Sequence, residues 1–218
     1  MSSNLPSKAE TNYSAIYGKL FSGLLNQFGT NYVSAIEDAI QNSFLKSLKI
    51  WTQNNVPNNK ANWLFIVARN DILNQIKRQK EHLDFPVEQF EDTSQTTNKT
   101  DLRLQTIIFI SALDNISNQA KILFVLKIIF GLSVLEIADS TLINQDAIYK
   151  NINRTKKSIQ LAFNNKTIEL DAIKASIKAI TIVEDILYAV FNIGFDSFNE
   201  NIENIVNEDL CLEAFALT

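Results

Sequence analysis

The chain has 218 residues, of which 46% are hydrophobic, and a formal charge of −4 at pH 7. This composition supplies apolar cores for one large or two to three small domains, and it excludes a disordered chain. One cysteine, Cys211, and one histidine, His82, cannot build a Cys/His zinc site or an internal disulfide, so we expect no metal and a cytoplasmic location. No signal peptide is recognisable, and charged residues interrupt both long apolar runs, so no membrane span is predicted.

The charges are segregated along the chain. Residues 1–80 carry a net +5 and residues 102–165 a net +3, whereas residues 81–101 carry −5 and residues 166–218 carry −7. Two basic blocks are thus separated by an acidic connector and followed by an acidic tail. This pattern is compatible with nucleic-acid binding, although the chain as a whole is acidic.

Three helices are predicted in the first 80 residues. Apolar residues recur at helical spacing over 14–28, 33–51 and 61–80, and Gly29 can end the first of these helices. Residues 52–62 contain five Asn and one Pro, which predicts a polar loop between the second and third helices. The three helices are expected to form a compact domain that ends in the basic cluster Lys77, Arg78 and Lys80.

The middle of the chain predicts a linker and then more helices. Residues 83–101 have no helical period and are rich in Thr, Asp and Glu, which indicates a flexible linker. Helices are expected over 102–112 and 117–130, the latter with Ser117 as its N-cap. Together with the helix pair that follows, they would make a second, four-helix domain.

Residues 131–159 predict two short helices joined by a tight turn. Ser133 and Glu136 have the spacing of a capping box, and Gly131 can end the preceding helix. The second helix has an apolar face of Ile148, Ile152 and Ile159, and its remaining surface carries cationic and amide groups. Such a helix is typical of the recognition helix of a helix-turn-helix. A surface helix pair whose lysines are merely solvated fits this stretch equally well.

The last fifty residues predict an apolar helical extension. Residues 167–193 are expected to form one long helix that ends at Gly194, and residues 210–217 a short final helix. The long helix is apolar over much of its circumference, so it requires packing partners. With its net charge of −7, the extension would either fold over the basic domains and compete with DNA, or be the remnant of a further domain.

Two stretches together resemble the extracytoplasmic-function (ECF) sigma factors of bacterial RNA polymerase. EDAIQNSF at 37–44, followed by Trp51, Val56, Pro57, Asn59, Trp63, Leu64 and VARN at 67–70, is similar to sigma region 2, and the helix-turn-helix is similar to region 4. ILYAVFNIGF (186–195) and EDLCLEAFAL (208–217) are similar to the start of a C-terminal extension found in one subgroup. There a tetratricopeptide-type domain follows, which we expect to be truncated or absent here.

The resemblance implies that region 2 binds the polymerase core and opens the −10 element of promoter DNA. Asp38, Gln41 and Phe44 match the polymerase-binding motif, although Phe44 fits a core position equally well. The 52–62 loop matches the segment that captures a flipped base, and a pocket of amides and stacking groups must offset the cost of unstacking. The residues implied for the −10 element are Asn54, Asn55, Asn58, Asn59, Trp63, Arg69, Asn70, Asn74, Lys77, Arg78 and Lys80. Trp63 could stack on a base, but a core position that holds the loop fits it better.

Region 4 is implied to read the −35 element in the major groove. Arg and Lys suit guanine and Asn suits adenine, so the implied contacts are Tyr149, Lys150, Asn153 and Arg154, with Lys156 and Lys157 on phosphates. The chain departs from the family pattern at Asn42, Asp71, Asn74 and Asp146, so we expect modest DNA affinity without polymerase. An anti-sigma factor is a further partner that the resemblance allows without requiring.

We therefore predict an all-α protein with two small helical domains, at 12–82 and 102–165, an acidic linker at 83–101 and a helical extension at 166–218. The predicted function is promoter recognition and transcription initiation with RNA polymerase, without catalytic residues or cofactors. The alternative is a stand-alone helix-turn-helix DNA-binding transcriptional regulator, which would usually be dimeric. An enzyme finds little support, because the sequence has no glycine-rich phosphate loop and its carboxylates are scattered.

Overall fold

The computed structural model describes residues 7–51, 55–81, 101–162, 170, 175–195 and 208–217, with side chains except at 7–15, 79–81, 162, 195, 208 and 209. Wherever the backbone is described, its regular structure is helical and no strand is found, which confirms the all-α prediction. The helices are α1 (Ser7–Phe28), a 3₁₀ turn η1 (Thr30–Tyr32), α2 (Val33–Ile50), α3 (Lys60–Glu81), α4 (Arg103–Ser111), α5 (Asn118–Ile128), α6 (Val134–Thr141), α7 (Gln145–Ala162), α8 (Ile177–Phe195) and α9 (Glu208–Ala216). None of these helices has the length and apolar character needed to cross a membrane.

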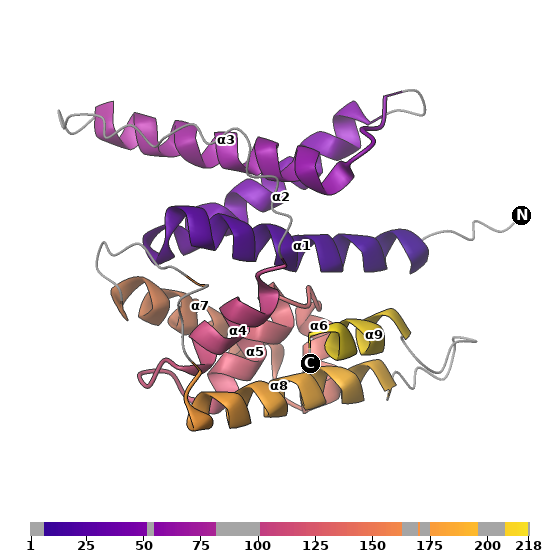
Figure 1. The fold of residues 1–218 in the computed structure, drawn as a ribbon, viewed down its shortest axis with the longest axis vertical. Helices are drawn as coiled ribbons and strands as arrows, with labels where there is room; N and C mark the ends of the chain where they lie inside the picture. The colour runs from indigo at the N-terminus through magenta and orange to yellow at the C-terminus, as the bar shows by residue number, and fades with distance from the viewer. Residues whose placement is uncertain are drawn as a thin grey trace, which may run out of the picture.

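Helix α1 lies between two layers of helices. In Figure 1, α2 and α3 form a hairpin on one side of α1, and α4 to α9 lie on its other side. The buried face of α1 serves both layers, and Phe21 packs edge-to-face against Phe124 of α5 with ring centroids 6.2 Å apart. The buried apolar residues from both halves of the chain consequently form one cluster. The domain boundaries drawn from the sequence stay a prediction.

Local signals set several helix ends as the sequence predicted. Helix α1 stops before Gly29, whose φ of 81° is favourable only for glycine. At the start of α5, the hydroxyl of Ser117 accepts a hydrogen bond from the backbone N–H of Ala120 at 3.3 Å. The predicted N-cap at Ser117 is therefore confirmed.

The prediction of one helix over 167–193 was wrong at its start. Helix α8 begins only at Ile177, because Ser176 is not helical and its hydroxyl caps the helix by accepting from the N–H of Ala179 at 3.1 Å. The predicted apolar stripe is confirmed within α8, where Ala179, Ile182, Ile186 and Val190 are all buried. Helix α8 packs against α4, α5 and α9, so its partners come from the second half of the chain.

Candidate nucleic-acid interface

Helices α6 and α7 are the two helices joined by a tight turn that were predicted for residues 131–159. The hydroxyl of Ser133 accepts from the N–H of Glu136 at 3.1 Å, and the carboxylate of Glu136 accepts from the N–H of Ser133 at 2.6 Å, which confirms the capping box. Gly131 has a φ of 68° and precedes it as predicted. The turn into α7 begins at Leu142, which is left-handed with a φ of 57°. Asn144 then caps α7 by accepting from the N–H of Asp146 at 2.8 Å.

Helix α7 has two sharply different faces. Ile148, Ile152 and Ile159 are buried and fix the helix to the core, as the spacing predicted. The opposite face is solvent-exposed and carries Tyr149, Lys150, Asn153, Arg154 and Lys157. Positions four apart on a helix are neighbours, so these side chains form one continuous cationic and amide surface, which we call the α7 face.

Lys156 differs from the other residues implied for the −35 element. Its ammonium group forms an ion pair with the carboxylate of Glu37 on α2, and only 16% and 14% of the two side chains is exposed. Next to it, the side-chain amide of Gln160 donates to the hydroxyl of Ser34 at 3.3 Å. Lys156 therefore faces α2 in this arrangement, whereas Lys150 and Arg154 face solvent.

The loop before α3 presents asparagines to solvent. Asn55 and Asn58 are exposed, and Asn54 lies outside the described residues. Asn59 is also exposed, but its side-chain oxygen accepts from the N–H of Asn62 at 2.9 Å. Asn59 thus acts as the N-cap of α3, a role that holds the loop at a fixed place relative to the helix.

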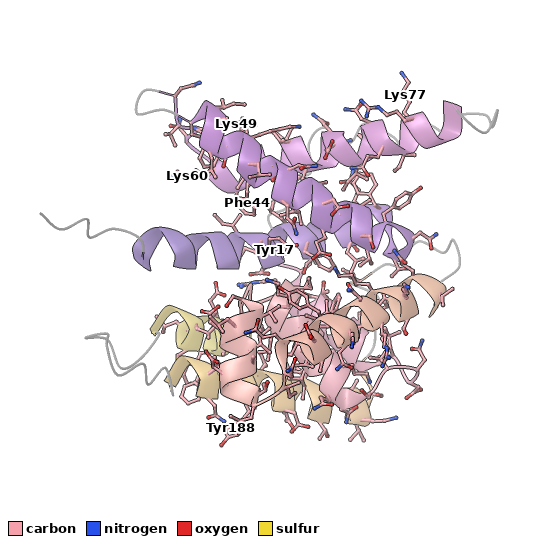
Figure 2. The ribbon with its side chains drawn as sticks, turned by 180° about the vertical axis from the view of Figure 1, so that it is seen from behind. Tyr17, Phe44, Lys49, Lys60, Lys77 and Tyr188 are labelled. Carbon is pink, nitrogen blue, oxygen red and sulfur yellow. The ribbon has the colours of Figure 1, made fainter. Side chains whose placement is uncertain are left out.

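Two tryptophans close the base of this loop. The rings of Trp51 and Trp63 meet edge-to-face with centroids 5.3 Å apart, and the ammonium of Lys60 lies 6.0 Å from the Trp51 ring centroid. Both rings are half-buried, so Trp63 supports the loop and keeps an exposed part. In Figure 2, Lys49 and Lys60 lie at this end of the α2–α3 hairpin and Lys77 lies toward the other end of α3.

The remaining residues implied for the −10 element lie along α3. Asn70, Asn74, Lys77 and Arg78 are exposed and Arg69 is half-buried, whereas the side chain of Lys80 lies outside the described residues. Asn42 and Asp71 meet in space, because the amide of Asn42 donates to the carboxylate of Asp71 at 3.1 Å. This hydrogen bond joins α2 to α3 within the hairpin.

A groove of about 460 Å³ runs along α2 where α1 and α5 approach it. Two residues implied for polymerase binding line it, Gln41 and Phe44, and the third, Asp38, is exposed one turn away. The Phe44 ring is stacked on that of Tyr17, with centroids 6.4 Å apart. Figure 2 labels the two residues where α1 and α2 face each other. Phe44 is therefore half-buried, with contacts both to the core and to the groove.

Sequence reasoning missed several groove residues. Leu45 and Leu48 line the groove and are 56% and 71% exposed, although both are apolar residues of the helix expected over 33–51. Burial, with Glu37 nearby, raises the pKa of Tyr17 far above its usual value. Burial also lowers the pKa of Lys127, which enters the groove from α5. In the sequence, α2 has more apolar residues than one buried face needs, and this excess could have indicated that Leu45 and Leu48 are exposed. No local sequence pattern indicated that Tyr17 or Lys127 would line the groove.

Comparison with known proteins yields one relative to report. No family model matches the chain, and no solved structure matches it. An uncharacterized protein from Rhizobium meliloti (strain 1021) is 28% identical over 198 residues, which cover 84% of this chain and 44% of that protein. This chain thus spans less than half the length of its relative. In the described part of the chain, no group of His, Cys, Asp and Glu side chains is arranged to hold a metal ion.

Proposed function

We propose that this protein is a sigma factor of the extracytoplasmic-function type, which binds RNA polymerase core and directs it to promoters. The observation that carries the proposal is the α7 face. Five exposed cationic, amide and phenolic side chains are displayed by a helix that a capped turn and three buried isoleucines hold rigidly. A rigid helix with such a face fits the major groove, where Arg and Lys recognise guanine and Asn recognises adenine.

A second surface favours a sigma factor over a stand-alone regulator. The α2–α3 hairpin presents exposed asparagines before α3, a tryptophan pair beneath them and cations along the helix. Amides and aromatic rings suit a single-stranded base, and cations suit its phosphates. A regulator that binds only duplex DNA does not require this combination of amides, aromatic rings and cations.

The polymerase-facing part of the proposal rests on the groove along α2. Its exposed leucines and aromatic rings, next to the polar side chains of Asp38 and Gln41, offer an apolar centre with a polar rim. Interfaces between proteins commonly have this composition. In the proposal, a helical element of the polymerase occupies this groove, and the chain itself carries out no catalytic step.

The test is reconstitution with bacterial RNA polymerase core. The purified chain and the core enzyme are combined on gel filtration and then supplied with a library of random-sequence promoter templates in a run-off transcription assay. We expect co-elution, and we expect the templates that yield transcripts to share two sequence elements upstream of the transcription start. A dimer that binds duplex DNA tightly without polymerase, and does not co-elute with it, would establish the regulator instead.

A further inference from the structure

An ammonium group without an ion-pair partner lies in the groove along α2. Lys127 lines the groove from the last turn of α5 and is half-buried there. In the described part of the chain, no carboxylate forms an ion pair with it. A cation that is partly removed from water without a counter-charge is costly, and an anion bound beside it offsets that cost.

The carboxylates near Lys127 are already engaged elsewhere. Glu37 also lines the groove, but its carboxylate forms the ion pair with Lys156 of α7. Glu136 is exposed to solvent, and its carboxylate accepts from the N–H of Ser133 in the capping box. Because Glu37 and Lys156 compensate each other and solvent screens Glu136, the charge of Lys127 makes this part of the groove favourable for an anion.

The rest of the groove offers apolar walls and one amide. Leu45 and Leu48 form an exposed aliphatic wall, the stacked rings of Tyr17 and Phe44 form another, and Gln41 adds its side-chain amide. The volume of about 460 Å³ falls within the range of small-molecule sites, about 300–1,000 Å³. Such sites combine apolar walls with a few polar groups that fix the orientation of the ligand.

We propose that this groove binds a soluble medium-chain monocarboxylic acid, whose carboxylate pairs with Lys127 and whose alkyl chain covers Leu45 and Leu48. The chain length follows from α2: Gln41 and Leu48 are two helical turns apart, a span of roughly 10 Å, which a medium-chain alkyl group matches. Covering the two leucines removes apolar surface from water, which favours binding by about 25 cal/mol per Å².

The consequence of such binding rests on the proposed function. Gln41 and Phe44 line the groove and are also two of the residues implied for polymerase binding. An alkyl chain and a polymerase element cannot fill the same volume. Two ligands that exclude each other lower one another's apparent affinity by the same factor, so the acid is expected to reduce the affinity for polymerase core.

The first test is equilibrium dialysis of the purified chain against radiolabelled decanoate, at concentrations below those at which decanoate forms micelles. We expect saturable binding of one decanoate per chain. Butyrate has the same head group but a shorter alkyl chain, and 1-decanol has the same alkyl chain but no charge. Each should compete for the site at least about tenfold more weakly than unlabelled decanoate, since each lacks one of the two contacts.

Two variants test the two contacts separately. Lys127→Met keeps an unbranched side chain without the charge and should weaken decanoate binding about tenfold, with the binding of 1-decanol retained. Leu48→Asn changes an exposed wall residue and should weaken the binding of both. Lys178→Met combined with Leu212→Asn is the matched control, because it alters the same residue types at exposed positions on α8 and α9. Circular dichroism checks that the helical content is retained.

Three results would overturn the site whatever else the protein does. The first is the absence of saturable decanoate binding. The second is decanoate binding that Lys127→Met leaves unchanged, or that 1-decanol matches in affinity, because the contact would then be apolar only. The third is association with vesicles of anionic phospholipid without binding of free decanoate, because the groove would then contact a membrane surface instead of a soluble acid.

The polymerase assay distinguishes failure of this inference from failure of the proposed function. Decanoate should reduce co-elution of the wild-type chain with polymerase core, and a higher concentration should be needed for Lys127→Met. If decanoate binds through Lys127 but the chain does not bind polymerase, the acid site stands and the sigma assignment falls. If both ligands bind without competing, the acid site and polymerase do not share the groove, and the inferred regulation is overturned.

Discussion

The guanidinium of Arg103 forms an ion pair with the carboxylate of Glu213 at 3.0 Å, although 110 residues separate them in sequence. Arg103 also donates to both carboxylate oxygens of Asp101, and the ammonium of Lys19 on α1 lies 3.6 Å from the Asp101 carboxylate. Three parts of the chain are joined here: α1, the start of α4 and α9. The described helices of the extension, α8 and α9, pack against α4, α5 and α1.

Replacement of Arg103 should be strongly destabilising. Its side chain is only 4% exposed, and Arg103→Ala leaves two carboxylates without their shared cation, which typically costs about 3 kcal/mol or more. Urea denaturation followed by circular dichroism measures the change in the free energy of unfolding. Lys19→Ala is the control: Lys19 is 51% exposed, and loss of such a surface pair should cost about 0.5 kcal/mol. Equal decreases in the free energy of unfolding in the two variants would show that the burial of Arg103 does not contribute to stability.

The same cluster predicts a specific pH dependence. Burial acts against the ionised form of Asp101, but hydrogen bonds and charge from Arg103 outweigh it and lower the pKa of Asp101. Its contribution to stability is thus present above the ordinary pKa of about 3.9 and lost as the pH falls through the lowered value. Burial raises the pKa of Glu213, so that residue acts in the opposite direction.

Comparison of the wild type with Asp101→Asn isolates the Asp101 term. The difference in unfolding free energy should be constant above about pH 5 and shrink toward zero in more acidic solution, because a protonated Asp resembles Asn. Thermal unfolding at a series of pH values gives this difference. A difference that does not vary with pH would mean that the Arg103 interaction is not electrostatic.

Leu142 should be a site where a substitution stabilises the fold. It is 93% exposed and left-handed, with a φ of 57°, and this conformation costs a branched residue about 1–2 kcal/mol. Asn adopts it more easily, so Leu142→Asn should raise the unfolding free energy by about 1 kcal/mol. Leu135→Asn, at an exposed helical position of α6, should instead lower it slightly. If Leu142→Asn lost stability, contacts rather than backbone strain would govern the turn.

The α7 face should control the salt dependence of DNA binding. Each phosphate contact contributes about 0.9 to the slope of log K against log salt. Lys150→Ala combined with Arg154→Ala should therefore lower that slope by about 1 to 2, with the base preference relaxed at the −35 element. Fluorescence anisotropy of the polymerase complex on a selected promoter measures both effects. Lys178→Ala on α8 is the control and should leave the slope unchanged.

The groove along α2 should control polymerase affinity. Asp38→Ala combined with Gln41→Ala should weaken binding to core polymerase at least tenfold, equivalent to about 1.4 kcal/mol, with no loss of helicity. Asp139→Ala with Gln119→Ala removes the same two side-chain types from exposed positions on α6 and α5 and should leave the affinity intact. Similar losses in both double variants would place the polymerase contact elsewhere.

Local structure follows from residues that are close together in the chain. The capping box of Ser133 and Glu136 and the alternation of buried Ile148 with exposed Lys150 depend on residues three or four positions apart, which interact in any helix. Ser176 is also a local N-cap signal for α8. Because apolar residues recur on both sides of it, the helix was predicted to begin earlier than it does. Periodicity therefore predicted which faces are buried better than where a helix begins.

Which helix faces pack against each other could not be read from local sequence patterns and depends on the folded chain. Lys156 carries the same local signature as Lys157, yet its partner is Glu37, 119 residues away. From the sequence, Gly18 is a residue of low helix propensity inside a helix. In the fold, the carbonyl oxygen of Ile129 occupies the place where a Cβ atom at position 18 would lie. Helical periodicity predicts that one face of a helix is buried, but it does not predict which element packs against that face. The reason is that the hydrophobic effect is non-directional. The choice of partner depends on shape and charge across the whole fold.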